Sequence, residues 1–342
     1  MTKPVGIGLV GAGAFGEFCL AAFSEMPEVR IAAVADLDAA RAETLASKYG
    51  AAAYGSLDAL LADPAVEIVA LNTPPYLHET QGLAAIAAGK HLFCEKPLAL
   101  TIGGGAALIE AAEARGIRLT VDYVMRQNPL WAAAAALRKG GVLGRLLHMS
   151  LTNHAAGLNL PDDHWFWDEA KSGGIWIEHG VHFFDAFAWV AGRYGEIVSS
   201  HRFARADGVV DRVESLATYG DTAAHFYHGF THSNKTEQTT VALTFERGHV
   251  KLHEWVPTVL ELTTDLDIDA LQAYLPPVNE RTQDGAMTRY KVQLESKSQL
   301  YREAIQAGMR DLALAVRDPH AQLAVDGTHG LASLRMAAAA SR

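Results

Sequence analysis

The first third of the chain alternates between short apolar runs and longer segments in which apolar and charged residues recur at helical spacing. Apolar runs typical of strands buried on both faces lie at residues 5–10, 31–35, 68–71, 91–94 and 117–121, with a briefer one at 51–54. Helical spacing is found at residues 39–49, 77–88 and 101–115. Because strands that alternate with helices build a parallel sheet with helices on both sides, the pattern predicts a doubly wound α/β fold.

The pattern changes near residue 122, where strand-like segments become frequent. Strands are predicted at 146–153, 209–213, 215–219, 223–230, 239–245 and 249–255, and helices at 130–139, 298–316 and 327–340, with a further helix that opens near residue 172 and runs to residue 190. Residues 263–289 show little periodicity. We therefore predict two domains, an α/β domain of residues 1–122 and an α+β domain of residues 123–342 built on a large, mostly antiparallel open sheet.

Composition narrows the class of protein. The 342 residues carry a formal net charge of −10 without a basic block, which argues against a nucleic-acid partner. No apolar run reaches the length of a membrane span, and the first strand begins too soon after Met1 for a signal peptide, so a cytoplasmic protein is expected. The two cysteines, Cys19 and Cys94, are interpreted as small buried hydrophobic residues in a reducing compartment.

A glycine-rich turn follows the first predicted strand and opens a helix. Gly11, Gly13 and Gly16 form a G-x-G-x-x-G motif, with Ala14 and Phe15 between the second and third glycines. The first glycine permits a tight turn, the second lets the backbone approach a pyrophosphate, and the third lets the helix pack against the strand. Free N–H groups at the helix N-terminus would hold the phosphates. The turn therefore predicts a dinucleotide site.

An acidic residue stands where such a site needs one. Asp36 ends the second predicted strand, where its carboxylate can accept hydrogen bonds from the adenosine ribose, although a solvated strand-end residue is the alternative. Asp36 and Asp38 would repel a 2′-phosphate, so NAD is favoured over NADP. Arg41 could weaken that preference.

Two loops are expected at the carboxyl edge of the parallel sheet, where open α/β sheets bind ligands. One runs from Asn72 to His78 and contains Thr73 and Pro74; the other is Glu95-Lys96-Pro97. Lysines at strand ends are usually exposed surface residues. At this edge, however, a positioned Lys96 cation would stabilise a developing alkoxide, which favours a catalytic role.

Polar residues also cluster in the predicted helix near residue 180. Glu178, His182 and Asp185 are spaced i, i+4 and i+7, which places them on one stripe of an otherwise apolar helix. These side chains either make hydrogen bonds within the core or form a catalytic site. In the preceding aromatic segment, 162–168, Trp167 and its neighbours either line a substrate pocket or anchor the loop.

A metal site is a weaker interpretation of the histidines. His179 and His182 are close in sequence, and His225, His228 and His232 follow later. In a strand, however, residues 225 and 228 point to opposite faces, so no metal is predicted.

Together, these motifs resemble the Gfo/Idh/MocA family, the glucose-fructose oxidoreductase and inositol dehydrogenase group. The resemblance rests on the glycine turn, Asp36, the Thr-Pro loop with His78, and Ala88-Gly89-Lys90-His91 leading into Glu95-Lys96-Pro97-Leu98-Ala99-Leu100. Residues 173–185 match the second family motif, except that Glu178 stands where the family usually has Asp.

The resemblance implies roles for individual residues. Lys96 would hydrogen-bond the reacting hydroxyl, and His182 would accept its proton. The Lys-Pro bond of this motif is often cis in the family, so a cis bond is expected between Lys96 and Pro97. The longer Glu178 would either bind a substrate hydroxyl or orient His182 or His179. Expected cofactor contacts are Gly11, Gly13, Ala14, Phe15, Gly16, Asp36, Thr73, Pro74, His78, Glu95 and Lys96, and expected substrate contacts are Tyr123, Arg126, Trp167, Glu178, His179 and His182. Homodimers or homotetramers through the second-domain sheet are also implied.

These observations predict an NAD(P)-dependent Rossmann-fold oxidoreductase that transfers a hydride between the nicotinamide and a hydroxyl or carbonyl carbon of a sugar, polyol or sugar derivative. Two alternatives remain. One is a dinucleotide-binding sensor without catalysis, although it would not need both Lys96 and His182. The other is an enzyme whose tightly bound NAD is recycled during elimination or glycoside cleavage.

Overall fold

A computed structural model describes residues 3–342. The chain forms two compact units, which are described separately. The first unit comprises the chain up to Val124 together with residues 170–173 and 302–334, and the second comprises residues 125–169, 174–301 and 335–342.

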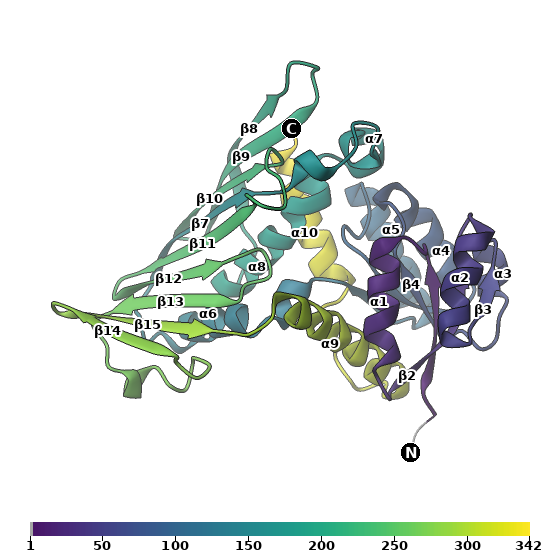
Figure 1. Cartoon of the computed structure of the whole chain (residues 1–342), viewed down its shortest axis with the longest axis horizontal. Coiled ribbons are helices and arrows are strands. Elements are labelled where there is room, and N and C mark those ends of the chain that lie inside the picture. The colour runs from purple at the N-terminus through teal and green to yellow at the C-terminus, as the bar shows by residue number, and fades with distance from the viewer. Residues whose placement is uncertain (1–2) are drawn as a thin grey trace. The chain divides into compact units, whose positions relative to one another are not determined.

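The first unit is built on a six-stranded parallel sheet, which confirms the predicted α/β fold (Figure 1). Its strands are β1 (Val5–Val10), β2 (Val29–Ala35), β3 (Ala52–Tyr54), β4 (Ile68–Leu71), β5 (His91–Cys94) and β6 (Leu119–Val121), in the spatial order β3-β2-β1-β4-β5-β6. Strands β1 and β4 are buried throughout. The strand order reverses between β1 and β4, which is where a doubly wound sheet binds its ligand.

Helices connect these strands and have the predicted boundaries to within a few residues. They are α1 (Ala14–Ser24), α2 (Ala39–Tyr49), α3 (Leu57–Leu61), α4 (His78–Ala87) and α5 (Ile102–Arg115), with a 3-10 turn at Pro75–Leu77. The Asp38 side chain caps α2, and Thr101 caps α5 by accepting a hydrogen bond from the Gly104 N–H. These caps explain why local sequence is enough to place the helix ends.

The last part of the chain returns to the first unit. Helix α9 (Lys297–Arg317) and helix α10 (Gly327–Ala340) supply residues 302–334. The Thr120 hydroxyl donates to the Val325 carbonyl at 2.7 Å, and Arg317 Nη1 lies 2.6 Å from a Glu67 carboxylate oxygen. The first unit is therefore not a continuous stretch of sequence.

The second unit contains a nine-stranded sheet, and its mostly antiparallel character confirms the predicted architecture (Figure 1). Its strands are β7 (Leu146–His154), β8 (Glu196–Ala204), β9 (Val210–Tyr219), β10 (Thr222–Gly229), β11 (Gln238–Phe245), β12 (Gly248–His253), β13 (Val259–Thr264), β14 (Glu280–Asp284) and β15 (Met287–Gln293). They follow the order β14-β15-β13-β12-β11-β7-β10-β9-β8, and β7 with β10 forms the parallel pair.

The predicted strands differ from the observed ones at several places. The two predicted strands at 209–213 and 215–219 form the single strand β9, Val210–Tyr219, because its alternating buried and outward positions continue through Glu214. The strand predicted to reach Trp255 ends at His253. Strands β8, β13, β14 and β15 were not predicted. Strand β14 is exposed throughout and β8 has no buried residue, so neither shows the apolar pattern of a strand.

Helices α6 (Pro129–Gly140) and α8 (Val181–Ala191) cover one face of this sheet (Figure 1). The Phe187 ring packs 4.6 Å from Phe226 of β10 and 6.1 Å from Trp131 of α6. A short helix, α7 (Glu169–Ser172), lies between β7 and α8, and 3-10 turns occur at Val124–Gln127, Gly157–Asn159, Trp165–Trp167 and Ile268–Ala270.

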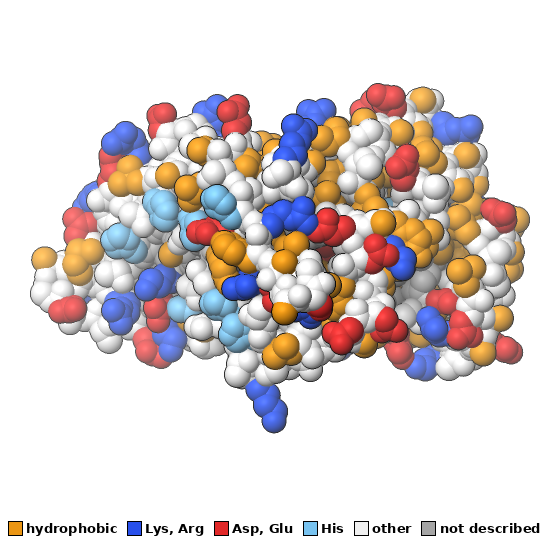
Figure 2. All heavy atoms as spheres, turned by 90° about the horizontal axis from the view of Figure 1, so that it is seen from above, with side chains coloured by type: hydrophobic (Ala, Val, Ile, Leu, Met, Phe, Trp, Pro, Cys, Tyr) orange, Lys and Arg blue, Asp and Glu red, His pale blue; other side chains and the backbone are white. Residues whose placement is uncertain are grey.

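The charged side chains and the two cysteines are placed as the composition predicts. In Figure 2, basic and acidic side chains are interspersed on the face that is drawn. Cys19 and Cys94 are buried free thiols, as predicted. None of the helices within residues 3–342 combines the length and apolar character that a membrane crossing needs.

Candidate active site

The glycine turn between β1 and α1 has the shape that a pyrophosphate requires. Gly11 has φ of +96°, a left-handed conformation that favours glycine, and a Cβ there would lie 2.6 Å from the Asn72 carbonyl oxygen. A Cβ at Gly16 would overlap the Gly11 carbonyl oxygen, so this glycine permits close helix packing. At Gly13 an added Cβ would meet nothing within 4 Å, and no side chain caps α1. The turn therefore leaves room and N–H donors for a phosphate.

Asp36 connects β2 to this turn. Its carboxylate oxygens accept hydrogen bonds from the backbone N–H groups of Ala12 and Asp38, each at 2.8 Å. Arg41 Nη1 lies 3.7 Å from Asp36 Oδ2. A carboxylate has further acceptor positions, so Asp36 can both hold the glycine turn and accept from a ribose.

His78 links the two loops at the carboxyl edge of the parallel sheet. Its Nδ1 lies 2.7 Å from the Pro97 carbonyl oxygen and its Nε2 lies 2.8 Å from the Thr73 carbonyl oxygen. The side chain is fully buried, and burial lowers the pKa of His78 although both carbonyls oppose that shift. The Lys96-Pro97 bond is cis, as the resemblance implies. His78 therefore fixes the loop that carries Lys96 relative to the loop that carries Thr73.

A buried pair of carboxyl groups lies beside Lys96. Glu95 follows β5 and Asp122 follows the neighbouring strand β6, and their side chains are hydrogen-bonded to each other. Burial raises the pKa of Glu95 well above its ordinary value and that of Asp122 to about 6, while the Lys96 ammonium lowers both. Two carboxylates in contact cannot both ionise readily, so the pair retains a proton near neutral pH. Sequence reasoning missed Asp122, although an acid directly after a buried strand was a signal.

In the second unit, the segment that carries Glu178 is a π-helical turn, Trp176–Gly180, followed by α8. The predicted stripe assumed one continuous α-helix, and the wider π-turn changes how Glu178 is oriented relative to His182. Both side chains are buried, at 9% and 3% exposure. Glu178 Oε2 lies 3.9 Å from His179 Nδ1, and the rings of His179 and His182 are 5.9 Å apart. The structure thus brings these three side chains together.

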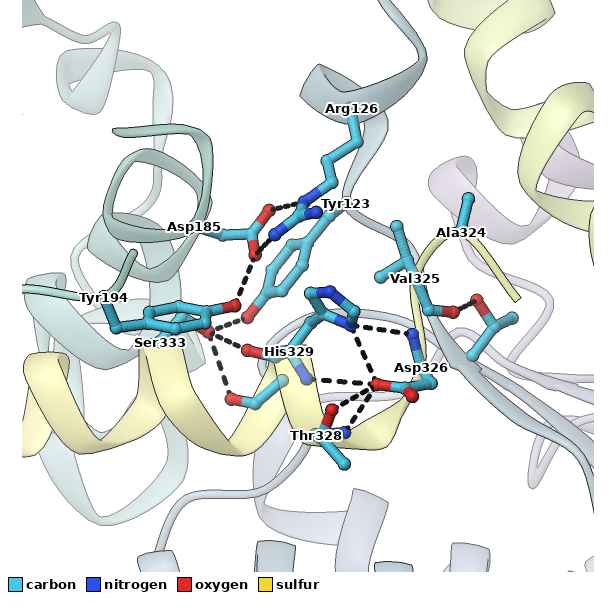
Figure 3. Close-up of polar contacts among 12 residues, drawn as sticks. Tyr123, Arg126, Asp185, Tyr194, Ala324, Val325, Asp326, Thr328, His329 and Ser333 are labelled. Carbon is cyan, nitrogen blue, oxygen red and sulfur yellow. Dashed lines mark hydrogen bonds and ion pairs between the residues drawn. The ribbon is translucent and has the colours of Figure 1, made fainter. Parts of the chain in front are cut away.

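The third member of the stripe has a different environment (Figure 3). Asp185 is fully buried, and its carboxylate accepts from Arg126 Nε at 2.8 Å and Arg126 Nη2 at 2.9 Å. The Tyr194 hydroxyl donates to the same carboxylate at 3.1 Å, and burial raises the pKa of Tyr194. Arg126 was expected to contact substrate, and the structure shows it anchoring α8 through two of its donors.

Two other residues that were expected to contact the substrate, Tyr123 and Trp167, make contacts within their own units. Tyr123 is 2% exposed, and its hydroxyl pairs with the Ser333 hydroxyl of α10 (Figure 3). The Trp167 ring lies 4.9 Å from the Arg205 guanidinium and 4.9 Å from the Phe166 ring. The Trp167 contacts anchor the aromatic segment, which was one of the two roles expected for it.

The later histidines separate as predicted for a strand. His228 is fully buried and its Nδ1 lies 3.1 Å from Asn153 Nδ2, whereas His225 pairs with Glu214 at 2.8 Å on the opposite face. Burial lowers the pKa of His228 strongly. Within residues 3–342, no group of three or more His, Cys, Asp or Glu side chains is arranged to hold a metal ion.

Comparison with known protein families gives two matches. Residues 5–123 match an oxidoreductase family with an NAD-binding Rossmann fold, and residues 131–251 match the GFO/IDH/MocA C-terminal domain. The part of the first unit that contains the six-stranded sheet is therefore an NAD-binding domain.

Curated relatives agree with this assignment. An inositol 2-dehydrogenase from Acidothermus cellulolyticus is 37% identical over 45% of this chain and 46% of its own length. A dTDP-3,4-didehydro-2,6-dideoxy-alpha-D-glucose 3-reductase from Saccharopolyspora spinosa is 28% identical over 68% of this chain and 70% of its own. The chain spans about half the length of the first curated relatives that it matches.

Solved structures show the same fold. A levoglucosan dehydrogenase in complex with NADH and levoglucosan has a TM-score of 0.84 at 18% identity, covering 98% of this chain and 96% of the other. A UDP-N-acetylglucosamine 3-dehydrogenase from Acidithiobacillus ferrooxidans has a TM-score of 0.76 at 20% identity, covering 99% and 97%. With both family domains matched in order along the sequence, this chain belongs to the Gfo/Idh/MocA oxidoreductase family.

Proposed function

We propose that this protein transfers a hydride between a nicotinamide cofactor and a hydroxyl or carbonyl carbon of a sugar, polyol or sugar derivative. The observation that carries the proposal is Lys96, which stands at the ligand-binding edge of an NAD-binding domain with a buried acid pair beside it. The second unit adds three potential proton acceptors, the buried His182 and Glu178 and the partly exposed His179.

The residues of the chain divide the chemistry between them. When bound, NAD supplies the hydride acceptor. His182 accepts the proton of the substrate hydroxyl, a task that suits an imidazole because its ordinary pKa lies near working pH. The Lys96 ammonium stabilises the negative charge that develops on the substrate as the hydroxyl loses its proton. Glu178 holds a second hydroxyl or orients His179.

The cofactor would be held by the turn and loops described above. Gly11, Gly13 and Gly16 admit the pyrophosphate at the N-terminus of α1, where Ala14 and Phe15 begin the helix. The loop residues Thr73, Pro74, His78 and Glu95 would contact the cofactor at the carboxyl edge of the sheet. Asp36 accepts from the adenosine ribose, and together with Asp38 it disfavours a 2′-phosphate, so NAD binds more tightly than NADP.

One relative favours a second candidate function. A 2,7-anhydro-N-acetylneuraminate hydratase from Escherichia coli is 28% identical over 73% of this chain. Hydration does not change the overall oxidation state of a substrate, so an activity of this kind here would require the cofactor to be returned to its starting state in each turnover. Copurifying cofactor that never accumulates in reduced form would favour this candidate.

The proposal is tested by following reduced-nicotinamide absorbance with NAD or NADP and a panel of polyols, aldoses and inositols. Turnover is expected with NAD, and Lys96→Ala and His182→Ala should each lower kcat by about 10²- to 10⁴-fold. NAD affinity of His182→Ala should stay unchanged, which separates chemistry from cofactor binding. Unimpaired turnover in either variant, or tighter binding of NADP than of NAD, would contradict the corresponding assignment.

A further inference from the structure

Trp255 lies beside the two histidines of the second-unit cluster and was not identified from the sequence. Its ring centroid is 5.3 Å from the His182 ring and 5.8 Å from the His179 ring. It also contacts the Tyr301 ring edge-on at 5.5 Å. Trp255 is partly exposed, whereas His182 is almost fully buried. A large aromatic surface therefore borders the group that we propose as proton acceptor.

The backbone that presents Trp255 is unusual. Among residues 3–342, the preceding residue, Glu254, is the one non-glycine with a positive φ, at +72°. Its N–H donates to the Thr239 carbonyl at 2.9 Å, and its carboxylate accepts from the Thr258 hydroxyl at 3.0 Å. A left-handed conformation is unfavourable for glutamate and persists where the surroundings enforce it, often at binding sites. The turn from β12 to β13 thus holds the Trp255 position at an energetic cost.

We propose that Trp255 is the wall on which the C–H face of a ring-form sugar or cyclitol rests while one of its hydroxyls faces His182. This inference rests on the proposed function, and it narrows the substrate class to ring-form sugars and cyclitols. It makes Trp255 a specificity-determining residue.

The chemistry of the two surfaces supports this assignment. A hydroxyl within hydrogen-bonding reach of His182 is also close to the indole, because the two rings are in contact. The face of an indole carries partial negative charge and attracts C–H groups, which a pyranose or cyclitol ring presents together on one side. An open-chain polyol must first lose torsional freedom to present such a face, so it gains less from the contact.

The test compares cyclic and open-chain substrates in three variants. Trp255→Leu keeps apolar bulk without a flat face, Trp255→Phe keeps a smaller aromatic face, and Trp189→Phe on α8 is the matched control. The ratio of kcat/KM for myo-inositol, glucose and galactose to that for sorbitol, mannitol and xylitol should fall about tenfold in Trp255→Leu, mainly through KM. Trp255→Phe should retain most of the ratio and Trp189→Phe all of it.

Tryptophan emission provides a readout that does not need turnover. In the complex with NAD, cyclic probes should change the emission of the wild type and of Trp189→Phe but not of Trp255→Phe. An unchanged substrate ratio in Trp255→Leu, an emission change that persists in Trp255→Phe, or no change in the wild type would overturn the inference. Absence of turnover with every substrate would contradict the proposed function alone, because emission still decides the role of Trp255.

Discussion

The Glu95 and Asp122 carboxyl groups have raised pKa values because both side chains are buried. Each follows a buried strand, at 7% and 4% exposure, and each interacts with the other. Desolvation therefore keeps a proton on the pair that either residue would lose in solution. The Lys96 ammonium beside them interacts with a pair of net charge close to −1. The pair adjusts the electrostatic surroundings of the proposed catalytic lysine.

This pair predicts a pH dependence of stability. The folded-state pKa of Asp122 is raised to about 6 from an ordinary value of 3.8, so the folded protein binds more protons than the unfolded chain between these values. The contribution to the unfolding free energy is fully present below pH 4 and is lost as pH rises through about 6. Asp122→Asn should remove this loss, on the order of 1–3 kcal/mol.

Denaturant unfolding of wild type and Asp122→Asn at intervals from pH 4 to pH 7 measures the effect as the difference between the two curves. Asp58→Asn, a substitution on α3, is the control and should run parallel to the wild type. A constant difference between wild type and Asp122→Asn across this range would show that Asp122 does not retain a proton on folding.

At the scale of elements, the structure differs from the sequence-based prediction where long-range packing decides. Helix α2 matches its predicted range because Asp38 and the left-handed Gly50 mark its ends locally. Strands β8 and β14 escaped prediction because sheet neighbours, rather than a buried apolar face, define them. The π-turn at Trp176–Gly180 departs from the helical period that the stripe argument assumed.

Some residues of the candidate site can be predicted from the sequence and others cannot, for the same reason. The glycine turn, Asp36 and Lys96 could be predicted because their motifs are contiguous or follow a strand directly. The position of Asp122 after a buried strand was a signal, but its partner Glu95 and the histidine partners of Trp255 lie in other elements, so the sequence did not pair them. Arg126 and Tyr123 were expected at the substrate, but the Asp185 and Ser333 contacts that hold them arise only in the folded protein.

The glycine turn predicts opposite outcomes for two similar substitutions. Gly13 has φ of −72° and open space around its missing Cβ, so Gly13→Ala should leave stability unchanged within about 1 kcal/mol while weakening NAD binding at least about tenfold. Gly16→Ala should destabilise the protein by roughly 1–3 kcal/mol or more, because its Cβ overlaps the Gly11 carbonyl.

Thermal unfolding and NAD titration of both variants provide the comparison. Each variant serves as the control for the other, since the same methyl group is added three residues apart in one turn. Full NAD affinity in Gly13→Ala would show that the open space at this position is not where the pyrophosphate binds.

At the scale of the molecule, the outer face of the second-unit sheet carries exposed apolar side chains. Leu216 of β9 is 47% exposed and Phe203 of β8 is 39% exposed, on the side away from the buried Val213 and Tyr219. We propose that copies of the chain associate through this face into dimers or tetramers, as the family resemblance suggested. Pairing of apolar surface would stabilise such an assembly.

Sedimentation velocity of wild type and of the double variant Leu216→Arg, Phe203→Arg tests this association. The wild type should sediment as a dimer or tetramer and the double variant as a monomer. Leu314→Arg, at another exposed leucine on α9, should not change the assembly. A monomeric wild type would rule out association through the sheet.

The return of residues 302–334 to the first unit has a consequence for how the protein is made. Gly105 of α5 lies against Leu331 and Leu334, and the Thr120 hydroxyl donates a hydrogen bond to the Val325 carbonyl, so part of the NAD-binding domain's packing comes from residues 302–334. A ribosome makes the glycine turn well before the residues that help to cover this domain. The nascent NAD-binding domain therefore stays incompletely covered until residues 302–334 have been translated, and chains that stop before them would leave it open to proteases.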